Sequence, residues 1–432
     1  MVPFPIDGIM NTLIGHLKEY LMGELEPFYP LMVASLSTGV AALAIIARLL
    51  RPDWITKDEV LHENLEGGPL WFFSRLLAPC IALSVYFGSR HYIGTDTLPG
   101  LFLANASFIV HHIAPRLIVL AVLLGLWAPL IMDFGLVRFI AVYASPVMRP
   151  LFKVPGRSAV DCVASWLGSS SMAVVFTAKM YDAGAYTARE AASIVCGFSL
   201  AGIYNIYAVA EMLNLEYLIS YILAVSYGVM IILAAILPRI WPLSSVPESY
   251  IGGRDTYKSS APELRHNCTM FQWALLRATN RAQKMTARHY LQESKNIICA
   301  LLFSTVPLMI TFGTLLTFIS ETTDIVSFFA EPFALLLRFA GAAEADIIGK
   351  TVVFAFVDQF LAVTYGRMLL TEQSRFICIC LTICGLINLT EVGLHVWHSN
   401  IPLRFWQMTA VYIIRIVISI FLILPAAALL VH

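Results

Sequence analysis

Residues 166–176 read WLGSSSMAVVF and place a glycine and three serines in the middle of an apolar run. The surrounding segment, AVDCVASWLGSSSMAVVFTAKMYD (159–182), has room for two helical arms of about 10 residues, each about half as long as a bilayer core is thick. Gly168 permits a turn between the arms, and serine hydroxyls can satisfy freed backbone groups. We therefore predict a re-entrant hairpin with its tip at 168–171. The alternative is one ordinary helix whose small serines allow close packing.

The composition of the 432-residue chain indicates an integral membrane protein. Hydrophobic residues make up 59% of the chain and charged residues only 13%, against about 25% charged residues in soluble domains. The 28 basic and 28 acidic residues balance, so nothing predicts a nucleic-acid partner. Eight stretches are long and apolar enough to span a bilayer, namely 29–50, 70–88, 113–132, 188–212, 217–237, 297–319, 376–396 and 405–430.

Two halves of the chain share one layout, on either side of the polar segment 244–295. Each half reads as a membrane helix, an interfacial segment (137–156 or 328–342), a glycine, an interrupted apolar stretch, a threonine, a glycine-containing helix and a last helix. Thr187 follows Gly156 by 31 positions and Thr371 follows Gly341 by 30. We expect an N-terminal amphipathic helix over the first 28 residues with two accessory membrane helices (1–112), a first repeat (113–243), a connecting loop (244–295) and a second repeat (296–432).

The charges near the helix ends predict that the two repeats are inverted. Segment 244–295 has eight Lys or Arg and four acids, and 134–187 has five and two, whereas the equivalent 321–372 has three and seven. Basic residues mark the cytoplasmic side, so loop 244–295 is expected there, with 277–295 as a basic amphipathic helix on the membrane surface. Inverted repeats are typical of secondary transporters.

The second interrupted segment, DIIGKTVVFAFVDQFLAVTYGRMLL (346–370), has Asp358 and Gln359 where the first has its serines. A carboxylate at the membrane centre costs about 2.5 kcal/mol or more, which a tip that meets water, a cation or a donor would reduce. We predict a second re-entrant hairpin with these residues at its tip. The alternative is a structural pairing of Asp358 with Arg367 or Lys350.

Polar residues also interrupt the helix that follows each hairpin. CGLINLTEVGLHVWH (384–398) groups Asn388, Thr390 and Glu391 just after Gly385, and a glutamate inside an apolar span must be paired, protonated or bound to a cation. CGFSLAGIYNIYAVAEM (196–212) carries Asn205 and Glu211. These two segments predict broken helices, with the first cluster as solute or coupling-ion ligands and the second pair as weaker candidates.

No motif in the chain predicts an enzyme, a cofactor or a metal site. A nucleotide-binding glycine loop, GxSxG and HExxH are all missing from the sequence. His111 and His112 begin one apolar stretch, and His395 and His398 end another. We expect both pairs to anchor their helices at the interface, with metal binding as the alternative.

The run VPGRSAVDCVASWLGSSSMAVVFTAKMYDAGAYTAREAASIVCGFSLAGI (154–203) resembles YjiH-type bacterial membrane proteins, which carry a nucleoside-recognition or Gate domain. Gate domains also occur in concentrative nucleoside transporters, the ferrous-iron transporter FeoB and spore-maturation membrane proteins. In the nucleoside transporters, solute binds where two hairpin tips meet two broken helices. The resemblance implies a solute site formed by Ser169, Ser170, Ser171, Asp358, Gln359, Asn388, Thr390 and Glu391.

These observations predict an all-helical polytopic protein of the bacterial inner membrane that forms a homo-oligomer, dimer or trimer. The expected function is secondary active transport of a small polar solute, nucleoside-like or resembling an amino acid or dipeptide, driven by sodium or protons. Glu391 and Asp358 are the candidates for the coupling ion. The alternatives are a non-transporting assembly or signalling protein of the spore-maturation type, and a metal-ion permease.

Overall fold

A computed structural model describes residues 4–6, 9–11, 13–58, 61–62, 65, 68–88, 97–132, 135–167, 170–251, 269–397 and 399–431. Within this part of the chain, seven helices are long and apolar enough to cross a membrane. They are Tyr20–Leu49, Trp71–Gly88, Leu98–Trp127, Ala188–Met212, Glu216–Ser245, Ala287–Thr322 and Phe405–Leu430. The prediction of an all-helical polytopic membrane protein is confirmed, apart from one short strand pair near the N-terminus.

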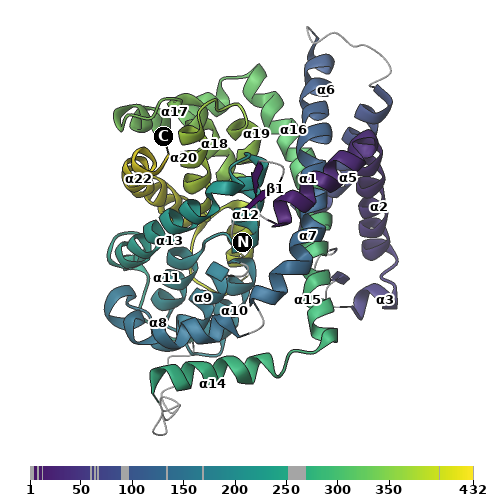
Figure 1. Cartoon of the computed structure of the whole chain (residues 1–432). Coiled ribbons are helices and arrows are strands. Elements are labelled where there is room, and N and C mark those ends of the chain that lie inside the picture. The colour runs from purple at the N-terminus through teal and green to yellow at the C-terminus, as the bar shows by residue number, and fades with distance from the viewer. Residues whose placement is uncertain are drawn as a thin grey trace.

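Long helices from the N-terminal quarter and the middle of the chain stand side by side (right in Figure 1), where α5 packs against α2 and α16, and α15 against α7. Arg48 of α2 lies over the ring of Phe72 of α5, 4.5 Å from its centroid. Two of these spans contain a π-helical turn, η2 and η8. The elements are α1 Leu13–Leu25, η1 Glu26–Phe28, α2 Tyr29–Leu49, α3 Asp53–Thr56, α5 Pro69–Gly88, α6 Leu98–Phe108, η2 Ile109–Ile113, α7 Ala114–Met132, α15 Ala287–Ala300, η8 Leu301–Thr305 and α16 Val306–Thr322.

The part of the first repeat that follows α7 forms blue and teal elements on the left of Figure 1. It consists of α8 Leu136–Phe152, η3 Gly156–Ser158, α9 Ala159–Leu167, α10 Ser170–Asp182, α11 Ala188–Phe198, α12 Ile203–Met212, η4 Glu216–Leu218, α13 Ile219–Ile236, η5 Leu237–Arg239 and η6 Leu243–Ser245. Helices α9 and α10 are separate and pack against each other. The chain at 159–182 therefore forms two arms and not one ordinary helix.

The part of the second repeat that follows α16 forms yellow-green and yellow elements at the upper left of Figure 1. It consists of α17 Ile325–Phe339, α18 Ala345–Val357, α19 Ala362–Gly366, α20 Glu372–Cys384, η9 Leu389–Gly393, α21 Leu394–Trp397 and α22 Phe405–Leu430. Gly349 allows α18 to approach α17 closely, since an added Cβ would lie 3.0 Å from the Ala330 carbonyl oxygen. One hydrophobic core runs through both repeats and the long helices.

The N-terminal prediction was wrong in part. Residues 4–6 and 9–11 are not helical; β1 (Phe4–Ile6) and β2 (Ile9–Asn11) form an antiparallel pair in which Phe4 lies opposite Asn11. The helix starts only at Leu13 and continues through η1 into the first span. The apolar positions at 9–14 fit a helix face, but Pro3 and Pro5 lack the amide hydrogens that helix propagation needs.

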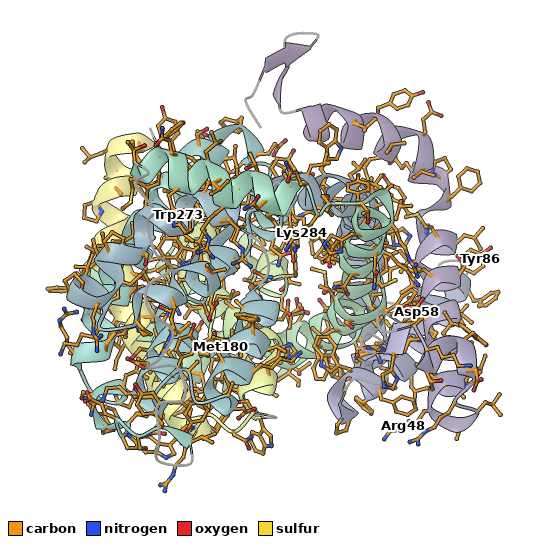
Figure 2. All side chains as sticks on the ribbon, turned by 90° about the horizontal axis from the view of Figure 1, so that it is seen from below. Arg48, Asp58, Tyr86, Met180, Trp273 and Lys284 are labelled. Carbon is orange, nitrogen blue, oxygen red and sulfur yellow. The ribbon has the colours of Figure 1, made fainter. Side chains whose placement is uncertain are left out.

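The prediction of one continuous basic surface helix over 277–295 is wrong in its continuity, because residues 283–286 are not helical. The segment divides into α14 (Met270–Ala282), which packs against α8 along the bottom of Figure 1, and the start of α15. Thr286 caps α15, because its hydroxyl accepts a hydrogen bond from the His289 amide at 3.2 Å. Lys295 on this helix pairs with Asp58. Figure 2 shows this face with Trp273 of α14 and with Lys284 just beyond that helix.

The predicted eighth span, 376–396, does not form a continuous helix, because it divides at Gly385 into α20 and η9. The boundary predicted between residues 112 and 113 falls inside the unbroken helical stretch Leu98–Trp127.

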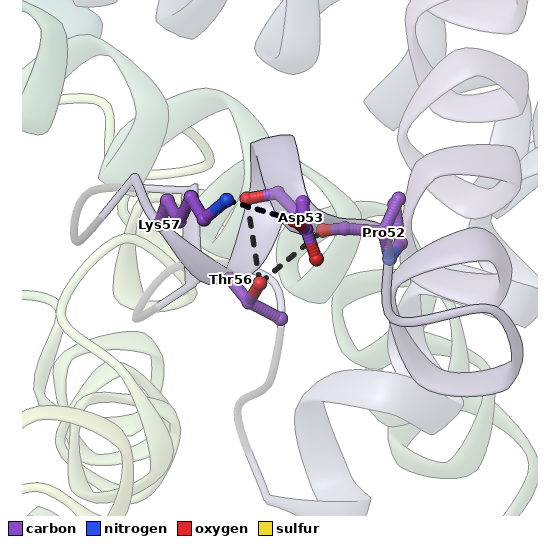
Figure 3. A network of polar contacts seen from close by, with 4 residues as sticks. All are labelled: Pro52, Asp53, Thr56 and Lys57. Atoms are coloured by element: carbon purple, nitrogen blue, oxygen red, sulfur yellow. Dashed lines mark hydrogen bonds and ion pairs between the residues drawn. The ribbon is translucent and has the colours of Figure 1, made fainter.

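The link between α2 and α5 carries a small surface network (Figure 3). Lys57 Nζ lies 2.7 Å from Asp53 Oδ2, and the Thr56 hydroxyl donates to the carbonyls of Pro52 and Asp53. The pair is exposed, so it contributes at most about 0.5 kcal/mol and orders this turn only locally.

Candidate functional site

Two helices are interrupted halfway, one in each repeat. Helix α11 has 11 residues, about 16 Å or half of a bilayer core, and residues 199–202 separate it from α12. Helix α20 has 13 residues, and residues 385–388 separate it from η9. The predicted broken helices are thus present, and the last carbonyl groups of each first half have no partner within their own helix.

Both broken helices begin with the predicted threonine. The Thr187 hydroxyl accepts from the Glu190 amide and the Thr371 hydroxyl from the Ser374 amide, each at 3.2 Å. In the second repeat, Glu344 also accepts from the Leu370 and Thr371 amides at 2.9 and 3.2 Å. Partial burial alone would raise the pKa of Glu344, but these hydrogen bonds, with those of the Thr371 and Ser374 hydroxyls, lower it below its ordinary value.

The first hairpin is attached to the first break by Ser165 and Trp166. The Ser165 hydroxyl and the Trp166 indole N–H both donate to the Phe198 carbonyl, at 3.0 and 2.9 Å. The indole also stacks on the Phe198 ring, with 5.7 Å between centroids. The Tyr227 hydroxyl of α13 donates to the Trp166 carbonyl at 2.8 Å. These contacts hold the arm that leads to the tip against α11 and α13.

The second hairpin has a buried polar turn at its tip. Asp358 and Gln359 are 3% and 1% exposed. The Asp358 carboxylate accepts a hydrogen bond from the Phe360 amide at 2.8 Å, the geometry of an Asx turn. The Tyr412 hydroxyl of α22 donates to the Val352 carbonyl of α18 at 2.5 Å. This repeats the contact that Tyr227 makes in the first repeat.

A buried arginine joins the two breaks. Arg415 of α22 is fully buried, and its Nε donates to the Cys384 carbonyl at 2.7 Å. Its Nη1 and Nη2 donate to the carbonyls of Cys196 and Ser199, at 2.8 and 2.7 Å. Nη2 also lies 3.0 Å from the Met230 sulfur. One guanidinium therefore caps the first halves of both broken helices.

The weaker candidates lie on α12. Asn205 is 5% exposed, and its Oδ1 has no hydrogen-bond partner among the described residues. Glu211 is fully buried at the other end of α12, within electrostatic range of Arg367. Arg367 donates from Nε to the Met212 carbonyl at 2.9 Å and from Nη1 to the His112 carbonyl at 3.3 Å. Glu211 thus belongs to a structural contact between the repeats, whereas Asn205 stands next to a break.

The elements predicted to form the solute site do meet. Helix α10, which begins at Ser170, packs against η9 and α21, and α18 also contacts η9. Asn388 is fully buried just before η9. Ser169 and the side chains of Ser170, Ser171, Thr390 and Glu391 lie outside the described part of the chain. The helices of the first hairpin and of the second broken helix are therefore neighbours.

Sequence reasoning missed Trp166, Tyr227, Tyr412 and Arg415. The signal for Arg415 was available: it is the single charged residue in the stretch 405–430, and a charge inside a span is a functional candidate by default. Among the residues searched, no group of three or more His, Cys, Asp or Glu side chains is arranged to hold a metal ion.

The comparisons with known proteins agree with the predicted resemblance. Residues 114–216 match the Gate family, described as nucleoside recognition, which confirms the resemblance to Gate-domain proteins. An uncharacterized protein of Alkalihalophilus pseudofirmus is 29% identical over 423 residues, or 97% of this chain and 89% of the relative.

Among solved structures, CNTnw in an inward-facing substrate-bound state has a TM-score of 0.43 and 16% identity, covering 96% of this chain and 97% of that chain. A doubly substituted CNTnw in an outward-facing state has a TM-score of 0.41 and 15% identity, with the same two coverages.

Proposed function

We propose that this protein is a secondary active transporter of a small polar solute, nucleoside-like or resembling an amino acid or dipeptide, coupled to a sodium or proton gradient. The observation that carries the proposal is the pair of broken helices, each packed beside a helical hairpin in its own repeat. Secondary transporters with inverted repeats bind solute and coupling ion at discontinuous helices. The Gate match over 114–216 covers the first hairpin and the first broken helix, and supports the same proposal.

The proposed solute site lies between the first hairpin tip and the segment around Asn388. Ser169, Ser170, Ser171, Gln359, Asn388, Thr390 and Glu391 are the proposed solute ligands. Hydroxyl and amide groups suit a solute that both donates and accepts hydrogen bonds. Such groups discriminate strongly, because a ligand that fails to pair them leaves them unsatisfied.

Asp358 and Glu391 are the proposed sites for a coupling proton or ion. Asp358 is buried at a turn and accepts from a backbone amide, so the charge on its carboxylate can be altered without unfolding a helix. Asn205 and Glu211 are proposed as secondary residues of the same site. We further propose a homo-oligomer, dimer or trimer, in a bacterial inner membrane with segment 244–295 on the cytoplasmic side.

The test begins with the purified full-length protein in a thermal-shift screen against nucleosides, amino acids, dipeptides and dicarboxylates. A ligand at 100 times its Kd stabilises the protein by about 2.7 kcal/mol, so a transported solute raises the unfolding midpoint. Uptake of that solute is then measured in proteoliposomes with imposed sodium or proton gradients. Asp358→Asn and Glu391→Gln are each expected to lower uptake at least tenfold or to change its pH dependence.

Asp346→Asn is the matched control. Asp346 lies in the first turn of α18, the helix that leads to the turn residue Asp358, but it is exposed and pairs with Arg338. The control should transport like the unmodified protein. Unchanged uptake and pH dependence in both Asp358→Asn and Glu391→Gln would contradict the mechanism. The absence of any uptake, with a phenotype only from changes in 244–295, would favour the assembly or signalling protein.

A further inference from the structure

Arg415 brings a permanent positive charge to the junction of the two repeats. It lies in α22, contributes three nitrogens to three backbone carbonyls, and is fully buried. Its partners Cys196 and Ser199 belong to the first repeat, and Cys384 belongs to the second. A buried charge is tolerated only when its hydrogen-bonding groups are satisfied, and here the partners are the ends of two interrupted helices.

The ends that Arg415 contacts are the negative ends of two half-helix dipoles. Cys196 lies in the last turn of α11, Ser199 follows that helix, and Cys384 is the last residue of α20. The last carbonyls of a helix have no partner within it and carry about half a negative charge. In transporters with broken helices, such ends and the unwound carbonyls beside them hold the coupling cation.

Four backbone carbonyls at the first break accept hydrogen bonds from protein side chains. The Val195 carbonyl accepts from the Ser199 hydroxyl, and the Phe198 carbonyl accepts from Ser165 and Trp166. The carbonyls of Cys196 and Ser199 accept hydrogen bonds from Arg415. A sodium ion at this junction would have to displace the guanidinium and meet its charge.

We propose that Arg415 is a built-in cation that replaces an exchangeable sodium ion at the paired half-helix ends, so that solute binding by this protein does not require sodium. The inference rests on the proposed transport function and deepens it, because it separates the two candidate gradients. It assigns to Arg415 a role that no predicted site residue has.

The test measures the thermal unfolding midpoint of the full-length protein in NaCl, KCl and choline chloride at equal ionic strength. The unmodified protein is expected to unfold at the same temperature in all three salts. Arg415→Met removes the charge and leaves the carbonyls in place. This variant is expected to unfold at a lower temperature and to recover by about 2–4 °C, saturably, as sodium replaces potassium.

Arg75→Met is the matched control. Arg75 is also buried, and it donates to the backbone carbonyls of Phe303 and Leu65, at 2.8 and 2.6 Å. Phe303, however, lies in the π-helical turn η8 and not at the end of a half-helix. Arg75→Met should therefore lower the midpoint equally in all three salts.

Two results would overturn the proposal. One is a saturable rise of the unmodified protein's midpoint with sodium over potassium. The other is an Arg415→Met variant that responds to the three salts as Arg75→Met does, which would make Arg415 purely structural.

If Arg415→Met does not fold, Arg415→Lys decides. It retains a cation with three donors and should remain indifferent to sodium, whereas a saturable sodium response in this variant would also contradict the proposal. These measurements use the solute-free protein, so a failure to find any transported solute would reject the proposed function without affecting them.

Discussion

The two repeats have the same order of helices but different polar side chains. Each has an amphipathic helix, a hairpin, a threonine-capped broken helix and a closing helix whose tyrosine, Tyr227 or Tyr412, hydrogen-bonds the first hairpin arm. The return arm has 13 residues in the first hairpin, whereas α19 in the second has only five. The buried arginine belongs to the second repeat alone and serves both. A shared backbone plan therefore carries polar groups that differ between its two copies.

Among these predictions, alanine substitution of the glycine near each break should give the largest difference in stability between the two repeats. A Cβ added to Gly385 would lie 2.9 Å from Ile416 Cδ1 and 3.0 Å from the Leu381 oxygen, whereas one added to Gly197 comes no closer than 3.6 Å, to Ala234 Cα. Gly385→Ala should cost about 1–3 kcal/mol through overpacking. Gly197→Ala should be neutral or stabilise by up to about 1 kcal/mol, because alanine favours the helix.

The free energy of unfolding in denaturant, measured on both glycine variants in the same detergent, tests this difference. Equal losses in the two variants would show that the two breaks are packed alike.

The paired tyrosines should differ less. Tyr412→Phe leaves the buried Val352 carbonyl without its 2.5 Å partner and should cost about 1–2 kcal/mol. Tyr227 and Trp166 are only partly buried, so water can replace the lost hydroxyl and Tyr227→Phe should cost about 0.5–1 kcal/mol. Unfolding free energies give the comparison, and a larger loss for Tyr227→Phe would reverse the assignment of the tighter hairpin to the second repeat.

The helix caps should be equivalent. Thr187→Ala and Thr371→Ala each remove a hydroxyl that accepts a 3.2 Å hydrogen bond from an amide in the first turn. Each should cost about 1 kcal/mol, with a difference between them smaller than that. Serine at either position is the control, since it retains the hydroxyl. A cost confined to one variant would show that the shared cap supports only one repeat.

The smallest effect is expected from Glu344, and it depends on pH. The folded state lowers the pKa of Glu344, so its stabilisation is complete above the ordinary glutamate pKa and disappears as the pH falls through the folded value. Glu344→Gln should therefore unfold at a slightly lower temperature at pH 7 and at the same temperature in strong acid. Thermal midpoints across this range test it, with Glu331→Gln as an exposed control. A difference that persists in acid would exclude the charge as its cause.

The sequence predicted the order and location of the helices better than it predicted the side-chain contacts between them. Apolar length located the long spans, and the glycine-to-threonine spacing located both hairpins and both broken helices. It did not predict that residues 4–6 and 9–11 pair as strands, although the prolines at the N-terminus argue against a helix there. It could not predict that 283–286 divides a basic stretch, because tertiary packing decides weak local preferences.

The hydrogen bonds that Arg415 makes at the two breaks could not be predicted from local sequence patterns. Arg415 reaches carbonyls 216 and 219 positions earlier in the chain, and no local pattern records such a pairing. The serine tip and Glu391 were chosen because they are polar within apolar runs, and their roles remain predictions.

The position of Arg415 also has a consequence for synthesis and membrane insertion. The residue lies in the last of the seven candidate spans, which is also the most apolar of them. An arginine at the centre of an inserting helix costs about 2.5–3.5 kcal/mol, and the surplus of apolar residues around it can offset that cost before any partner is found. The half-helices α11 and α20 precede α22 in the chain. The carbonyls that Arg415 contacts therefore lack this donor until α22 packs against them.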